Sequence, residues 1–135
     1  MLRLSKKVEY GIIAIRHIAS LNCRGTVTTA KEISETYDIS YELLAKVLQR
    51  LTKTGLIVSY QGVRGGYILA RNADSISISS IISAIEGYSP AITQCISGNS
   101  GKCEIFENCT IKNPLGKIQN NINEAFEKMM LSEIV

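Results

Sequence analysis

The sequence predicts a mainly α-helical fold with one small β-hairpin and a long C-terminal helix. Three observations indicate this class: apolar residues recur at spacings of three and four in several segments, two short β-rich segments flank a glycine-rich stretch, and helix-capping residues separate the segments. At 135 residues the chain has the length of one domain, which buries roughly two-thirds of its unfolded surface. We therefore expect one compact domain with three parts: residues 1–87, 88–112 and 113–135.

The first helix is predicted to begin after Ser5, which acts as the N-cap, and to end near Asn22 and Gly25. Its apolar residues form a wide stripe at helical spacing, so we expect the helix to lie largely buried. The stripe contains Val8, Ile12, Ile15, Ile18 and Ala19.

Two further helices are predicted from capping signals. Thr29 and Glu32 form a capping box, in which each side chain accepts a hydrogen bond from the backbone of the other, and this box begins a short helix to about Thr36. A tight turn follows at residues 37–39, and Ser40 is expected to cap a second helix that Gly55 ends. One face of this second helix is apolar and the other is polar, so it is predicted to be amphipathic.

A hairpin is predicted from the segments Ile57–Tyr60 and Tyr67–Ala70, which the glycine-rich stretch Gln61–Gly66 joins. A short helix is then expected to begin at Ser77 or Ser79 and to end at Gly87, whose lack of a side chain suits a helix C-terminus.

The last helix is predicted to have Asn113 as N-cap and Pro114 at its first position, and to run to about Ser132. Its apolar residues alternate at spacings of three and four, as in two helices packed side by side. This seam favours a homodimer over burial against the chain's own domain, because so long a helix is hard to cover with so small a domain. The seam contains Leu115, Ile118, Ile122, Ala125 and Met129.

Short helix, tight turn, amphipathic helix and hairpin follow one another in the order of a winged helix-turn-helix, which binds double-stranded DNA. The charge distribution agrees with this interpretation. Residues 1–73 carry eleven Lys/Arg and five Asp/Glu, a net charge of +6, whereas residues 74–135 carry four and seven, a net charge of −3. Chance clustering of surface charge is the alternative explanation.

In this fold the helix from Ser40 to Thr54 enters the major groove, where glutamine pairs with adenine and the basic side chains meet guanine edges or phosphates. Arg64, among the glycines of the hairpin tip, is placed to reach a minor groove; a plain hairpin turn is the alternative. The predicted DNA-binding residues are Tyr41, Glu42, Lys46, Gln49, Arg50, Lys53 and Arg64.

Three cysteines follow in a polar stretch: Cys95, Cys103 and Cys109, spaced C-x7-C-x5-C. Thiolates gathered on a loop bind soft metals. Zinc is a competitor, although its sites usually contain close C-x2-4-C pairs, which this stretch lacks. A metal-free switch, in which two of the thiols form a disulfide, also remains open. Cys23 lies apart from the trio and is expected to be a small buried apolar residue.

The segments 39–51, 55–58 and 62–67, together with the cysteine trio, resemble the iron-sulfur-dependent winged-helix regulators of bacteria, the IscR/NsrR-like family. The resemblance also covers Leu4–Lys7 and Leu131–Val135, and so nearly the whole chain. It implies a winged helix in residues 1–87, a cluster-binding loop in residues 88–112 and a dimerisation helix in residues 113–135. It also implies an iron-sulfur cluster near the subunit interface, held by Cys95, Cys103, Cys109 and a fourth ligand that varies within the family.

The fourth ligand is where this sequence departs from part of the family. One branch has a histidine three residues after the last cysteine, but here that position is Lys112, whose protonated amine cannot bind iron. In other branches a carboxylate of the first helix of the partner subunit completes the cluster, and Glu9 occupies that position. One of these branches also has a histidine where this chain has Ile13. The alternative for Glu9 is a surface carboxylate paired with lysines. Both 2Fe-2S and 4Fe-4S clusters remain open.

We therefore expect a cytoplasmic transcriptional regulator, acting as a repressor, that senses redox state, nitric oxide or iron-sulfur status. A zinc-bound or thiol-switch regulator and a small electron carrier are the alternatives. No catalytic constellation is found, so we do not expect an enzyme. No membrane association is expected, because Glu9, Arg16 and His17 interrupt the apolar residues near the N-terminus.

Overall fold

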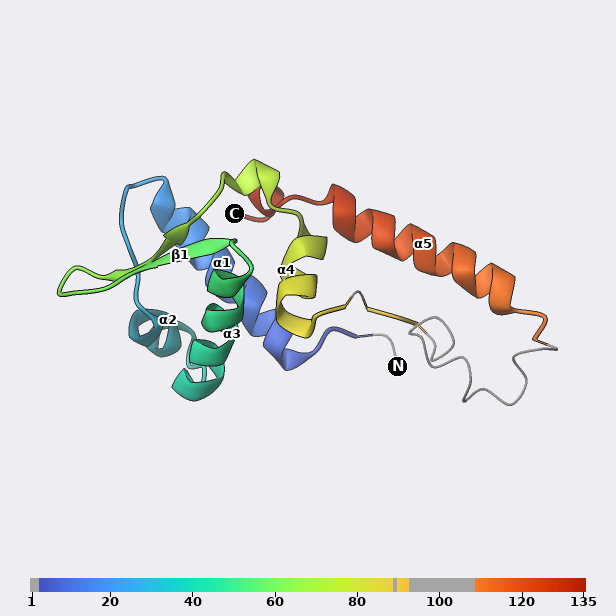
Figure 1. Ribbon diagram of the computed structural model, residues 1–135, viewed down its shortest axis with the longest axis horizontal. Coiled ribbons are helices and arrows are strands. Elements are labelled where there is room, and N and C mark those ends of the chain that lie inside the picture. The colour runs from blue at the N-terminus through green and yellow to red at the C-terminus, as the bar shows by residue number, and fades with distance from the viewer. Residues whose placement is uncertain (1–2, 89, 93–108) are drawn as a thin grey trace.

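The computed structural model describes residues 3–88, 90–92 and 109–135 of the chain. Within these residues the fold is mainly helical with one antiparallel hairpin, which confirms the predicted class. Figure 1 shows a body made of the first four α-helices and the hairpin, from which the long helix α5 extends. The elements are α1 (Lys6–Asn22), α2 (Ala30–Tyr37), α3 (Tyr41–Lys53), β1 (Ile57–Tyr60), β2 (Gly66–Leu69), the 3-10 helix η1 (Ala73–Ser75), α4 (Ile78–Glu86), α5 (Lys112–Lys128) and the 3-10 helix η4 (Leu131–Glu133).

Most helix starts follow the predicted capping residues. The Ser5 hydroxyl accepts a hydrogen bond from the Val8 N–H at 3.3 Å, and the capping box of Thr29 and Glu32 has both of its hydrogen bonds. Ser77, rather than Ser79, caps α4. Ser40 occupies the N-cap position of α3, but its side chain makes no capping hydrogen bond. Capping depends on neighbouring residues alone, which is why the sequence predicts these boundaries well.

The core lies where α1, α3 and α4 meet. As expected, α1 is largely buried, and the apolar face of α3 packs against it. Gly11 permits this close packing, because a Cβ atom there would overlap the Ile85 side chain and lie 3.2 Å from Val47 Cγ1. The bulkiest residues that are fully buried include Ile15, Ile18, Ile33, Leu44, Leu48, Leu51, Ile81 and Ile82.

The hairpin is held to the body by a third segment of chain. Strands β1 and β2 pair in the register Ile57↔Leu69 to Tyr60↔Gly66. Thr28, which is buried, forms a bridge to Tyr67, whose N–H donates to the Thr28 carbonyl at 2.7 Å. This tie joins β2 to the segment that precedes α2. Strand β2 begins at Gly66, which pairs with Tyr60, and ends at Leu69, so both of its ends lie one residue earlier than predicted.

The start of α5 differs from the prediction. The helix begins at Lys112, so Asn113 is its second residue, Pro114 is its third, and Ile111 is an N-cap without a side-chain hydrogen bond. Proline is tolerated here because the N–H groups of the first turn have no acceptor within the helix. The prediction of Asn113 as N-cap was wrong because proline fits any position of the first turn.

The end of α5 also differs, because the helix stops at Lys128 and not near Ser132. The next residues pair with the segment before α4: the Ile78 N–H donates to the Met129 carbonyl at 2.9 Å, and the Leu131 N–H donates to the Ile76 carbonyl at 2.7 Å. Leu131 is fully buried in the core. This long-range pairing replaces the last helical turn. None of the helices in the described ranges is long and apolar enough to cross a membrane.

Candidate functional site

The predicted recognition helix α3 presents its polar residues outward. Leu44, Val47, Leu48 and Leu51 are buried. The ion pairs found among residues 3–88, 90–92 and 109–135 do not involve α3, so its charges remain directed to solvent. The exposed residues are Tyr41, Glu42, Lys46, Gln49, Arg50 and Lys53, the six predicted from the sequence.

The turn between α2 and α3 has a defined geometry. Asp38 ends α2 in the left-handed conformation, with φ of 53°, and the Ile39 N–H donates to the Ser34 carbonyl at 3.0 Å. His17 Nδ1 lies 2.9 Å from the Tyr37 hydroxyl, and the two rings meet edge to face. This contact joins α1 to the end of α2. No local motif predicts this partner of His17, because 20 residues separate it from Tyr37.

The wing, which is the hairpin of β1, β2 and the residues between them, projects from the body on the side of α2 (Figure 1). Arg64 is exposed at its tip. A turn within the tip is closed by the Gly65 N–H, which donates to the Gly62 carbonyl at 3.0 Å. In β2, burial raises the pKa of the Tyr67 hydroxyl, and the nearby Tyr41 raises it further. Strand β2 therefore has Tyr67 near the start of α3.

One of the three predicted thiolate ligands lies within the described residues. Cys109 is half-buried and precedes the first residue of α5 by three positions. Cys95 and Cys103 lie outside the described residues, and among the residues that are described no group of three or more metal-ligating side chains gathers. Cys23 is exposed at the end of α1, so its predicted burial was wrong.

Glu9, the predicted fourth ligand, lies on the first turn of α1. Its carboxylate is 2.8 Å from the Lys6 amine, and both side chains are exposed. The hydrogen bond to Glu9, and then its charge, raise the pKa of Lys6. This is the lysine pairing that we considered as the alternative for Glu9. An exposed pair of this kind contributes little to stability, so Glu9 can leave Lys6 for another partner.

Gln119 connects α5 to residues 90–92, which lead into the cysteine segment. It is 4% exposed and is the one buried residue of α5. Its side chain accepts from the Ile92 N–H at 2.8 Å, and its amide donates to the Pro90 carbonyl at 2.7 Å and to Asn123 Oδ1 at 2.9 Å. We call this arrangement the Gln119 clamp. The sequence analysis did not predict this arrangement. A glutamine next to Ile118 of the apolar seam is only a weak indication of a buried polar contact.

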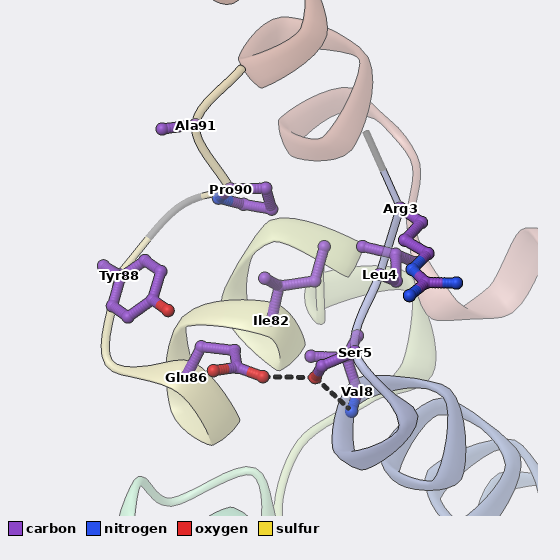
Figure 2. Close-up of a pocket in the computed structure, with 9 residues that line it drawn as sticks. All are labelled: Arg3, Leu4, Ser5, Val8, Ile82, Glu86, Tyr88, Pro90 and Ala91. Atoms are coloured by element: carbon purple, nitrogen blue, oxygen red, sulfur yellow. Dashed lines mark hydrogen bonds between the residues drawn. The ribbon is translucent and has the colours of Figure 1, made fainter. Parts of the chain in front are cut away.

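A pocket of about 210 Å³ lies between the start of α1, the end of α4 and the residues that follow it. Figure 2 shows Ser5 between Glu86 and Val8 at its edge. The Ser5 hydroxyl donates to the Glu86 carboxylate and accepts from the Val8 N–H, so one side chain both caps α1 and ties it to α4. Tyr88 and Pro90, which precede the cysteine segment in the sequence, also line the pocket.

A short helix, a fixed turn, an exposed polar helix and a tied wing define a DNA-binding protein of the winged helix-turn-helix class. The comparison with known families agrees with this class and makes it specific. The chain belongs to the Rrf2 family, described as iron-dependent transcriptional regulators, which it matches over residues 4–135.

Individual relatives and solved structures are similar along nearly the whole chain. The HTH-type transcriptional regulator IscR of Pectobacterium atrosepticum is 31% identical over 134 residues, which cover 99% of this chain and 79% of the relative. The structure of CymR, the global cysteine regulator of B. subtilis, has a TM-score of 0.78 and 25% identity, covering 99% and 96% of the two chains. IscR of T. potens has a TM-score of 0.71 and 28% identity, covering 98% and 85%. The chain is therefore a transcriptional regulator and not an enzyme.

Proposed function

We propose that this regulator is a homodimeric repressor whose operator binding depends on an iron-sulfur cluster. The observation that carries the proposal is the position of Cys109, which is half-buried and lies three residues before α5, the helix that extends from a DNA-reading body (Figure 1). The cluster would be held by Cys95, Cys103 and Cys109 of one subunit and by Glu9 of the other. The description of the family as iron-dependent and the similarity to IscR proteins support it.

The donor set suits such a cluster. Cysteine thiolates are the usual ligands of iron-sulfur centres. Glu9 would add a hard oxygen, which makes the weakest bond of the four. When bound, the cluster would supply reactivity toward oxidants and nitric oxide. The three cysteines would hold the cluster, and the bond from Glu9 would break most readily.

A second copy of the chain is the proposed partner of α5. Of its apolar seam, Ile118 is 48% exposed and Met129 is 46% exposed. The helix extends from the body, and its orange N-terminal end lies well away from the other helices in Figure 1. Pairing of two such helices would remove these side chains from water.

In the dimer each α3 would enter a major groove of the operator, and each wing would reach a minor groove with Arg64. Gln49 would read adenine, while Lys46, Arg50 and Lys53 would meet guanine edges or phosphates. A change at the cysteine segment would reach α5 through the Gln119 clamp and alter the distance between the two copies of α3. This is a shift between two populations of the dimer, one of which fits the operator.

The decisive experiment combines anaerobic purification, visible absorption and a gel shift with the cluster present or removed. We expect visible absorption from the cluster, and a gel shift of the operator DNA whose strength depends on the cluster. Glu9→Ala should change the absorption spectrum and shorten the lifetime of the colour in oxygen. A spectrum and lifetime equal to those of the wild type would remove Glu9 from the ligand set. Colour without a sequence-selective shift would indicate an electron carrier.

A metal-free thiol switch is the second candidate, favoured by the similarity to the global cysteine regulator of B. subtilis. In such a switch two cysteine thiols would lose two protons and two electrons to a peroxide, which becomes water, and the sulfurs would form one disulfide. This candidate predicts a gel shift without colour. Peroxide treatment followed by mass spectrometry of the cysteine peptides would identify the bond.

A further inference from the structure

A cationic groove lies between α1 and α3. Its volume is about 360 Å³, and Val47 and Ile85 lie among its apolar lining residues. Four basic side chains line it: Lys7 from α1, and Lys46, Arg50 and Lys53 from α3. No carboxylate is among its lining residues. A groove of this composition attracts an anion with several charges.

The basic residues occupy one side of α3. Lys46, Arg50 and Lys53 recur at spacings of four and three, so they share a stripe of the helix. Tyr41 lies on the other side, near Tyr67 of β2 in the wing. The outward face of α3 is therefore flanked by the wing on one side and by the cationic groove on the other.

Lys7 is available for an outside partner. It is exposed, and within residues 3–88, 90–92 and 109–135 it takes part in neither of the two ion pairs found. The two carboxylates at this end of α1 are engaged elsewhere: Glu9 pairs with Lys6, and Glu86 accepts a hydrogen bond from Ser5. The positive charge of Lys7 is therefore left facing the groove.

A helix seated in the major groove of DNA has a phosphate backbone on each of its two sides. We propose that the wing meets one backbone and the cationic groove meets the other, with Lys7 binding a phosphate from outside the helix-turn-helix. The proposal rests on the DNA-binding function of the family. It also changes the role of Arg50, which becomes a phosphate contact and not a reader of guanine.

The test uses the full chain and a duplex that the wild-type protein selects from a random-sequence pool, beside an unrelated duplex of equal length. Dissociation constants are measured by fluorescence anisotropy at several salt concentrations. Lys7→Gln should lower the slope of log affinity against log salt by about 0.9 per protomer, because binding with one phosphate contact fewer releases one counterion fewer. The change should be equal on both duplexes. Lys7→Arg should keep the wild-type slope.

Lys117→Gln is the matched control, because it removes the same charge from an exposed position on α5 and should leave the slope unchanged. Thermal melting checks that each variant is folded. An unchanged slope for Lys7→Gln would assign the groove to a small anion or a protein and overturn the proposal. A loss confined to the selected duplex would also overturn it, since it would make Lys7 a base reader. If the wild type selected no duplex from the pool, the DNA-binding function itself would fail as well.

Discussion

Replacing Gln119 by leucine tests whether the clamp holds residues 90–92 to α5. Leucine is close to glutamine in size but can neither accept from Ile92 nor donate to Pro90. Two backbone groups that now have partners at 2.8 and 2.7 Å lose them. A buried polar group without a partner costs about 1–3 kcal/mol.

Two facts reduce that figure. Pro90 and Ile92 are half-buried, so water can satisfy their backbone groups in part. Leucine also buries more apolar surface than glutamine, which is favourable. We therefore expect Gln119→Leu to lower the free energy of unfolding by about 1–2 kcal/mol, at or below the low end of about 2 kcal/mol for two such groups. Asn123→Ala removes only the third hydrogen bond of the clamp and should cost less than about 1 kcal/mol.

Urea unfolding followed by far-UV circular dichroism measures these changes, provided that the unfolding slope stays that of the wild type. Hydrogen exchange gives an independent reading, because the Ile92 amide should exchange faster in Gln119→Leu than in the wild type. Equal stability together with unchanged exchange at Ile92 would refute the clamp. Lower stability without faster exchange would assign the loss to repacking of α5.

The remaining predictions concern DNA reading, the hairpin and alkaline pH. Gln49→Ala should change base preference, whereas Arg64→Ala should mainly lower affinity; equal losses for Gln49→Ala on selected and random duplexes would contradict base reading. Gly66→Ala should lower stability by about 2 kcal/mol or more, measured as the urea midpoint, because its Cβ would lie 2.6 Å from the Thr28 carbonyl oxygen at a φ of +155°. Gly25→Ala, in open space at a φ of +66°, should cost about half as much. The pKa of Tyr67 is raised above its usual 10.0, so its contribution to stability is present below pH 10 and is lost as pH rises through the higher value; Tyr67→Phe should lose less stability than the wild type between about pH 9 and 11.

Local signals predicted most of the fold. The caps at Ser5, Thr29 and Ser77 depend on residues at most three positions away, and the structure has all three. The end of α5 was mispredicted because its last apolar residues keep helical spacing while the backbone pairs with residues 76–78. Helical periodicity in the sequence does not reveal that the backbone of this segment pairs with a distant segment of the chain.

The exposed polar face of α3 was predicted in full, because burial of one side of an amphipathic helix determines what the other side presents. The residues that were missed act across long separations. Gln119 bonds to residues 27 and 29 positions away, and Lys7 meets the basic stripe of α3 only once α1 and α3 have packed together. Both depend on tertiary structure and leave no short motif.

The two ends of α5 are held very differently. After Lys128 the chain is pinned by its pairing with residues 76–78 and by Arg16, whose side chain donates to the Ile134 carbonyl at 2.5 Å. A rigid helix of 17 residues is about 25 Å long. If α5 rotates about its anchored end, which we call the fulcrum, the Cys109 end, which we call the tip, moves the furthest. A rotation of about 10° at the fulcrum moves the tip by about 4 Å. A displacement of about 4 Å at the Cys109 end therefore needs a turn of only about 10° at the anchored end, where Arg16 of α1 is hydrogen-bonded to the C-terminal segment.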